Sequence, residues 1–194
     1  MNPAFQFDSY LLKRQVFALT GKFRVYGPSG ELVLFSEQKM FRLRDDIRVY
    51  GDESKSQELL MIKSRQIIDF SAAFDVIDSL AGQKVGVLRR KGLRSILRDQ
   101  WEILDANDTL VGVLYEDNVA LALLRRFLLG FWLPQHYDMT LGTERVGDLR
   151  QRLHLLAYQL EMNFRMDLAH RLDRRIGIAA GILLAAIEGK QHEE

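Results

Sequence analysis

Short runs in which apolar and polar residues alternate fill most of the chain, and four pairs of runs repeat one pattern. In each pair an aromatic residue opens the first run, a polar turn follows, and an apolar run returns. The pairs are residues 23–26 with 31–35, 74–77 with 84–88, 101–104 with 110–114, and 137–140 with 145–149. A period of two is typical of strands that bury one face. The sequence therefore predicts a series of antiparallel hairpins.

The predicted strands begin near Val16 and dominate to about Glu116. Residues 41–44 and 47–50 also alternate, and the polar stretch 51–58 predicts an exposed loop. Three of the four return strands contain a glycine, which permits a bend or a close approach of another backbone. These glycines are Gly86, Gly112 and Gly147.

The last long apolar segment, residues 176–187, has no polar face. A helix that is apolar all round must be enclosed, and these 12 residues are fewer than the roughly 20 that cross a bilayer. Asp173 is placed to cap its amino end. Gly177, Gly181 and Ala185 form a stripe of small residues that gives strands room to approach. The sequence thus predicts a mainly β protein, a curved sheet closed into a barrel around this helix.

One segment interrupts the hairpins. Residues 117–133 lack alternation and predict a helical insertion that ends before Pro134. Two interpretations remain open. The helix packs over one barrel opening, or it lies at a membrane interface with Arg125, Arg126 and Trp132 at the level of the lipid headgroups.

Composition supports one domain over residues 1–194, with 47% hydrophobic and 27% charged residues. The net charge of +1 implies that any charged partner is attracted by a local patch. The absence of cysteine excludes disulfides, thiolate zinc sites and a thiol nucleophile. No secretory signal is visible at the amino end, so a cytoplasmic location is the expectation.

Several landmarks occur in an order that resembles a known fold. They are Tyr10–Phe17, Phe23–Glu31, Trp101–Asp105, Pro134–Leu149 and Asp173–Ile182. In this order they resemble the tubby C-terminal-like superfamily, most closely its LURP-one-related branch. The resemblance implies a closed antiparallel barrel of about twelve strands that encloses the hydrophobic C-terminal helix.

Function transfers less directly from the resemblance. Tubby proteins bind phosphoinositide headgroups on a basic face, and phospholipid scramblases are more distant relatives. This chain lacks the cysteine-rich acylation segment, the proline-rich arm and the calcium loop of scramblases, so lipid scrambling is not carried over.

The strongest candidate site is a run of cations without an intervening acid. It consists of Arg89, Arg90, Lys91, Arg94 and Arg98. Guanidinium and ammonium groups suit phosphate oxygens, which makes anionic lipid headgroups the leading hypothesis. The competing interpretation is a solvated edge that discourages aggregation. Nucleic acid is disfavoured because no aromatic residue lies between Val85 and Gln100 for bases to stack on.

A second basic group has mixed signs around it. Arg171, Arg174 and Arg175 lie near Asp167 and Asp173, which predicts salt-bridged anchoring at the barrel mouth.

Catalysis finds little support in the sequence. His136, His154, His170 and His192 show no metal-binding spacing, and no nucleophile elbow or phosphate-cradling loop is present. The sequence therefore predicts no enzyme, cofactor or metal site.

The functional prediction is a non-catalytic module that binds anionic phospholipid or phosphoinositide headgroups at the inner face of a membrane, without a transmembrane span. The alternative is a scaffold or regulatory module that recognises another protein through barrel-end loops. A third option is an apolar ligand between the barrel wall and the helix.

Overall fold

The computed structural model describes residues 1–15, 21–38, 46–65, 72–91, 100–116, 134–152, 154 and 157–188. Within these residues lie a short 3-10 helix, twelve strands and one α-helix. They are η1 (Pro3–Phe5), β1 (Ser9–Gln15), β2 (Gly21–Tyr26), β3 (Leu32–Gln38), β4 (Ile47–Tyr50), β5 (Glu58–Ser64), β6 (Ala73–Asp78), β7 (Gln83–Arg90), β8 (Gln100–Leu104), β9 (Leu110–Glu116), β10 (His136–Leu141), β11 (Glu144–Arg152), β12 (Ala157–Asn163) and α2 (Arg174–Glu188).

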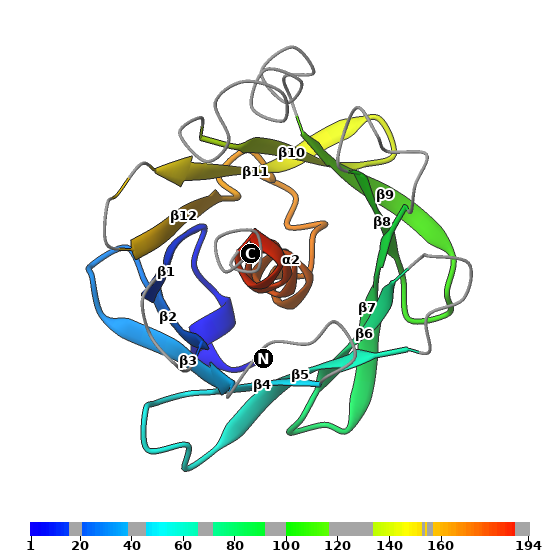
Figure 1. Ribbon diagram of the computed structural model, residues 1–194. Coiled ribbons are helices and arrows are strands. Elements are labelled where there is room, and N and C mark those ends of the chain that lie inside the picture. The colour runs from blue at the N-terminus through cyan, green and yellow to red at the C-terminus, as the bar shows by residue number, and fades with distance from the viewer. Residues whose placement is uncertain are drawn as a thin grey trace.

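The twelve strands form a closed antiparallel barrel in which each strand pairs with its neighbours in the sequence. The barrel closes between the first and last strands, with Ser9 opposite Asn163 and Gln15 opposite Ala157. Figure 1 looks along the barrel and shows α2 inside the ring of strands. The four predicted hairpins are confirmed as β2–β3, β6–β7, β8–β9 and β10–β11. The predicted fold class is therefore confirmed.

Three strands were given no run of their own: β1, β12, and β5, which lies within the range where strands were predicted to dominate. β1 lies before Val16, where the strands were predicted to begin, so that boundary is wrong. The run of Leu11 beside Leu12 obscures its alternation, although only Leu12 is fully buried. β12 buries alternate residues, but it follows a stretch without a clear turn signal. The predicted strand 41–44 and the predicted helix 117–133 lie outside the described residues.

The helix α2 is enclosed as predicted. Ile178, Ile182 and Leu183 are each 0% exposed. The helix lies against β12 and β1 and against β6 and β7. Asp173 accepts a hydrogen bond from the backbone N–H of Arg175 at 3.0 Å, which confirms the predicted cap.

The predicted small residues permit close packing of α2. A Cβ atom on Gly177 would lie 2.5 Å from Cζ of Phe164, and one on Gly181 would meet the sulfur of Met162. Because Met162 belongs to β12 and Phe164 follows it, the glycine stripe faces this part of the wall. The glycines of the return strands are also confirmed as close-approach positions. A Cβ on Gly86, Gly112 or Gly147 would meet Leu104, Thr140 or Phe164 respectively.

The amino-terminal segment contributes to the barrel interior, a feature the sequence did not reveal. Figure 1 shows η1 inside the ring of strands. Phe5 is 2% exposed and belongs to the hydrophobic core. The Tyr10 hydroxyl donates to the carbonyl of Ala4 and accepts from the N–H of Phe7, each at 3.1 Å. The hydroxyl of Tyr10 therefore fixes the fold of residues 4–7 against the wall.

Replacing Gly177 or Gly181 of α2 by alanine should lower the free energy of unfolding by different amounts. We expect Gly177→Ala to lower the free energy of unfolding by about 1–3 kcal/mol, because the new methyl overlaps the fully buried ring of Phe164. Gly181→Ala should cost less, because the flexible side chain of Met162 can move and alanine gains about 1 kcal/mol of helix propensity. Urea denaturation of both variants measures the contrast, and equal costs would contradict this packing.

Because the hydroxyl of Tyr10 is buried, we expect the protein to lose stability at alkaline pH. Burial raises its pKa from 10.0 to about 12. The folded protein holds this proton more tightly than the unfolded chain, so the contribution is complete below pH 10 and lost as pH rises from about 10 to about 12. Its size is about 3 kcal/mol at most.

Denaturation of wild type and Tyr10→Phe across this pH range measures the effect. The stability advantage of wild type should shrink as pH rises, since other groups titrate alike in both proteins. A pH-independent difference would contradict the role assigned to Tyr10.

Candidate functional site

The basic cluster lies where β7 ends. We use this name for Arg89, Arg90 and Lys91, the described members of the predicted site. Arg94 and Arg98 lie outside the described residues, as do the predicted membrane contacts Arg125, Arg126 and Trp132.

A glutamate on the neighbouring strand organises two members of the cluster. Arg89 stands opposite Glu102 in the register of β7 and β8. Nε and Nη2 of Arg89 lie 2.7 and 2.6 Å from Oε2 of Glu102. The ammonium of Lys91 lies 3.0 Å from Oε1 of the same carboxylate. One carboxylate thus holds two cations side by side.

The carboxylate is buried and the cations are not. The side chain of Glu102 is 10% exposed, whereas those of Arg89 and Lys91 are 44% and 48% exposed. Burial raises the pKa of Glu102, but hydrogen bonds and charge from Lys91 and Arg89 outweigh it, and the net pKa lies below its usual value. The carboxylate of Glu102 thus holds two half-exposed cations at the surface.

Arg90 lies on the other face of β7. Leu88 is 0% exposed and belongs to the core, so alternation along the strand places Arg89 outside and Arg90 on the inner side. Arg90 is in register with Trp101, which is also a core residue. The five predicted cations therefore do not all share one surface. The sequence did not reveal Glu102 as the partner of Arg89 and Lys91. The alternation of Trp101, Glu102 and Ile103 indicates only that Glu102 points outward.

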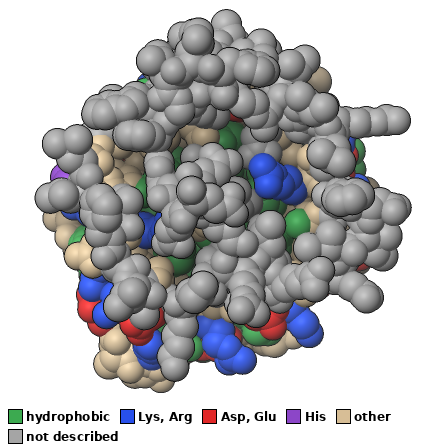
Figure 2. All heavy atoms as spheres, in the orientation of Figure 1, with side chains coloured by type: hydrophobic (Ala, Val, Ile, Leu, Met, Phe, Trp, Pro, Cys, Tyr) green, Lys and Arg blue, Asp and Glu red, His purple; other side chains and the backbone are tan. Residues whose placement is uncertain are grey.

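Pairing of cations with carboxylates recurs on the outer wall. Glu37 lies 3.4 Å from the ammonium of Lys22 and also pairs with Lys55. Asp148 lies 2.9 Å from Nε of Arg150. Figure 2 shows acidic and basic side chains next to one another along the lower edge of the molecule. Ion pairs are thus a general property of this surface, and Asp148 is as buried as Glu102, so the basic cluster differs by its place at a strand end.

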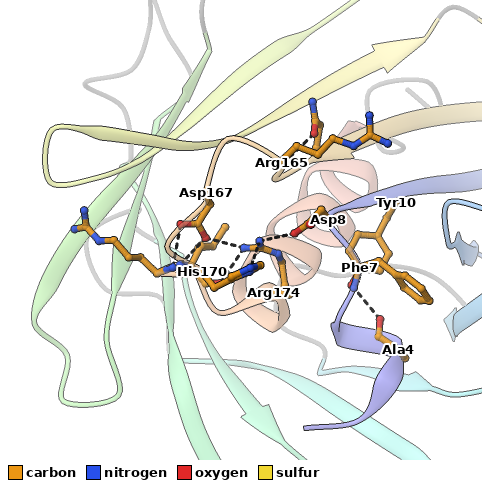
Figure 3. A network of polar contacts seen from close by, with 11 residues as sticks. Ala4, Phe7, Asp8, Tyr10, Arg165, Asp167, His170 and Arg174 are labelled. Atoms are coloured by element: carbon orange, nitrogen blue, oxygen red, sulfur yellow. Dashed lines mark hydrogen bonds and ion pairs between the residues drawn. The ribbon is translucent and has the colours of Figure 1, made fainter.

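The second basic group forms an anchor at the opposite end of the barrel, as predicted. Arg174 is 5% exposed and begins α2. Its guanidinium donates to Asp167 and to Asp8, each at 2.8 Å, and to the carbonyl of Leu172 at 3.1 Å. It also lies 3.3 Å from Nδ1 of His170. Figure 3 shows Arg174 between Asp8 and Asp167.

Two more arginines extend the anchor. Arg175 pairs with Asp173 and with Asp78, which ends β6, and Arg171 pairs with Glu144, which begins β11. The pKa of Arg174 is raised, because the hydrogen bonds that it donates to Asp167 and Asp8 outweigh the lowering effect of burial. Each of these guanidinium groups faces carboxylates of this chain, so the group holds the structure together.

The described residues show neither a cluster of metal ligands nor a helix that could span a membrane. In these ranges no three His, Asp or Glu side chains gather as ligands of a metal ion. Among the described helices, none combines the length and apolar character needed to cross a bilayer. His192 lies outside the described residues.

A family model described as LURP-one-related matches residues 32–185, which is most of the chain. The matched region runs from β3 into α2 and contains the basic cluster and Glu102. No curated protein matches the chain.

The anchor predicts a large cost for removing one partner. Arg174→Met should lower the free energy of unfolding by about 3–5 kcal/mol, because Asp167 is left charged and buried. Arg174→Met combined with Asp167→Asn should recover part of the loss. Guanidinium chloride denaturation of both variants tests this, with exposed Arg165→Met as the control; a double variant less stable than the single one would contradict the anchor.

Proposed function

The chain belongs to the LURP-one-related family of the tubby-like superfamily, and on that premise we propose that it is a non-catalytic module that binds the phosphate groups of anionic lipids through the basic cluster. The observation that carries the proposal is the shared carboxylate, which fixes Arg89 and Lys91 next to each other in solvent.

Fixing the cations lowers the cost of binding. Arg and Lys side chains lose up to about 2 kcal/mol of rotamer freedom when they are immobilised. Here Glu102 engages Nε and Nη2 of Arg89, so part of that loss is already incurred in the folded protein. The side chains of Arg89 and Lys91 are about half exposed, so an anion can approach both from solvent. A phosphate oxygen can bridge the two groups in front of the carboxylate.

The expected affinity is modest and depends on salt. Each basic residue near an anionic bilayer contributes about 1 kcal/mol, and the attraction falls off within a Debye length. Two pinned cations therefore support reversible peripheral attachment at the inner face of a membrane. Arg94, Arg98, Arg125, Arg126 and Trp132 remain proposed as additional contacts.

The alternative function is recognition of another protein, and the observation that supports it comes from a different surface. That surface lies at the other end of the barrel and carries exposed apolar side chains.

Liposome sedimentation tests the lipid proposal. Arg89→Gln with Lys91→Gln should weaken binding to vesicles of phosphatidylcholine and phosphatidylinositol bisphosphate by about tenfold or more, because two contacts are removed. Wild type should bind less as salt rises and should not bind vesicles of phosphatidylcholine alone.

The matched control is Lys22→Gln with Lys55→Gln. These lysines also share one carboxylate, Glu37, and the charge change is the same. Equal losses in the two double variants would mean that only net charge matters. Equal binding of wild type to neutral and anionic vesicles, or to neither, would remove the proposal.

A further inference from the structure

Residues 1–8 lie across the end of the barrel where α2 begins, and we call them the amino-terminal strap. They precede the first strand, which starts at Ser9 opposite Asn163. Figure 1 shows η1, the middle of the strap, inside the ring of strands. Phe5 is 2% exposed and belongs to the hydrophobic core, whereas Met1 is 66% exposed. The strap therefore covers interior surface that the strands leave open.

The strap is folded by hydrogen bonds within itself. The side chain of Asn2 accepts the N–H of Ala4 at 2.9 Å, and the carbonyl of Asn2 accepts the N–H of Phe5 at 3.0 Å. The carbonyl of Pro3 accepts the N–H of Gln6 at 3.1 Å. Because these bonds join residues of the same segment, the strap can move as a unit without breaking them.

The polar contacts between the strap and the rest of the described chain converge on Tyr10, Phe164 and Arg174. The Tyr10 hydroxyl holds Ala4 and Phe7, as described above. The carbonyl of Asp8 accepts the N–H of Phe164 at 2.7 Å, and its carboxylate accepts the guanidinium of Arg174 at 2.8 Å. Figure 3 shows Asp8 and Tyr10 on either side of Phe7 in the sequence, each with its partners.

Strand β1, which follows the strap, is held far more firmly. Every residue from Ser9 to Gln15 is in register with a residue of β12, and Leu11 to Arg14 are also in register with β2. The strap has no such ladder. Its attachment depends on the burial of Phe5 and on the few polar contacts near Asp8.

The ion pair of Asp8 is built so that it can be broken. The side chain of Arg174 is 6% exposed and that of Asp167 is 2% exposed, but that of Asp8 is 45% exposed. Breaking a buried ion pair normally leaves a charge without compensation. Here Arg174 keeps Asp167 when Asp8 leaves, and Asp8 regains water. The contact therefore resembles a surface ion pair, which contributes little to stability.

We propose that the amino-terminal strap opens and closes as a unit while the barrel stays folded, with its hinge near Asp8. Segments with few buried contacts open in local steps much more often than a core does. Opening withdraws Phe5 from the core and exposes the apolar interior at the start of α2. The strap is thus a gate to the inside of the barrel, a device separate from the basic cluster.

Hydrogen exchange of the wild-type protein in rising urea tests the gate. The amides of Phe5, Gln6 and Phe7 should exchange about 100-fold or more faster than those of β12, because they open locally. They should still exchange at least about tenfold slower than in an unstructured peptide, because the strap is mostly closed. Their rates should not change with urea below the unfolding transition, whereas global unfolding makes the β12 rates rise.

Thiol labelling tests access without relying on amides. The chain contains no cysteine, so an introduced one is the only thiol. Phe5→Cys and Phe74→Cys make the same replacement at positions that are 2% and 0% exposed, the first in the strap and the second in β6. N-ethylmaleimide should label Phe5→Cys about 100-fold or more faster than Phe74→Cys.

Four further variants identify what holds the gate. Tyr10→Phe removes the hydroxyl and keeps the ring, and should speed exchange of the strap amides about tenfold. Asp8→Asn should speed it several-fold, whereas the matched control Glu53→Gln, an exposed carboxylate paired with Arg24, should leave it unchanged. Ile103→Val, within β8, should speed exchange of the β12 amides several-fold and leave the strap amides unchanged.

Any of three results would overturn the gate. One is exchange of the strap amides at the rates and with the urea dependence of β12, which would make the strap part of one cooperative unit. The second is exchange at the rate of an unstructured peptide, which would mean that the strap does not close. The third is equal labelling of Phe5→Cys and Phe74→Cys. The lipid proposal is tested separately, since none of these readouts depends on Arg89 or Lys91.

Discussion

The enclosure of α2 is the constraint on which the rest of the structure depends. Ile178, Ile182 and Leu183 have no exposed surface, and burying each such side chain is worth about 1.5–3 kcal/mol. An open sheet would leave one side of this helix in water, so the pairing of β12 with β1 completes its shelter. The helix in turn fills the barrel, and its glycines set how closely Met162 and Phe164 approach. Barrel closure and the all-apolar helix therefore require each other.

Two positive charges at the start of α2 are electrostatically unfavourable, and nearby carboxylates compensate for them. Arg174 and Arg175 occupy the first turn, where the helix dipole disfavours positive charge. Asp167, Asp8 and Asp173 offset both the dipole and the desolvation of Arg174. The same bonds join the amino-terminal segment, the loop before α2 and the start of the helix. A locally unfavourable sequence thus becomes the point where distant parts of the chain are fastened together.

The sequence predicted those features that depend on local pattern. Alternation identified four hairpins, and the lack of any polar face identified the enclosed helix. Features that depend on contacts between distant residues were not predictable. Asp8 and Arg174 are 166 positions apart, and nothing near Asp8 marks it as an ion-pair partner. Likewise Glu102 lies in another hairpin from Arg89, so the run of cations looked free of acids until the register of β7 and β8 paired them.

The two ends of the barrel differ in chemistry because different forces shape them. At the start of α2 the carboxylates are committed to the anchor, and this rigidity is what allows an apolar side chain such as Leu168 to stand in water without collapsing. At the end of β7 a single buried carboxylate holds two half-exposed cations. With a net charge of +1, the molecule as a whole attracts neither sign of charge strongly, so selectivity for a charged partner must come from local surfaces.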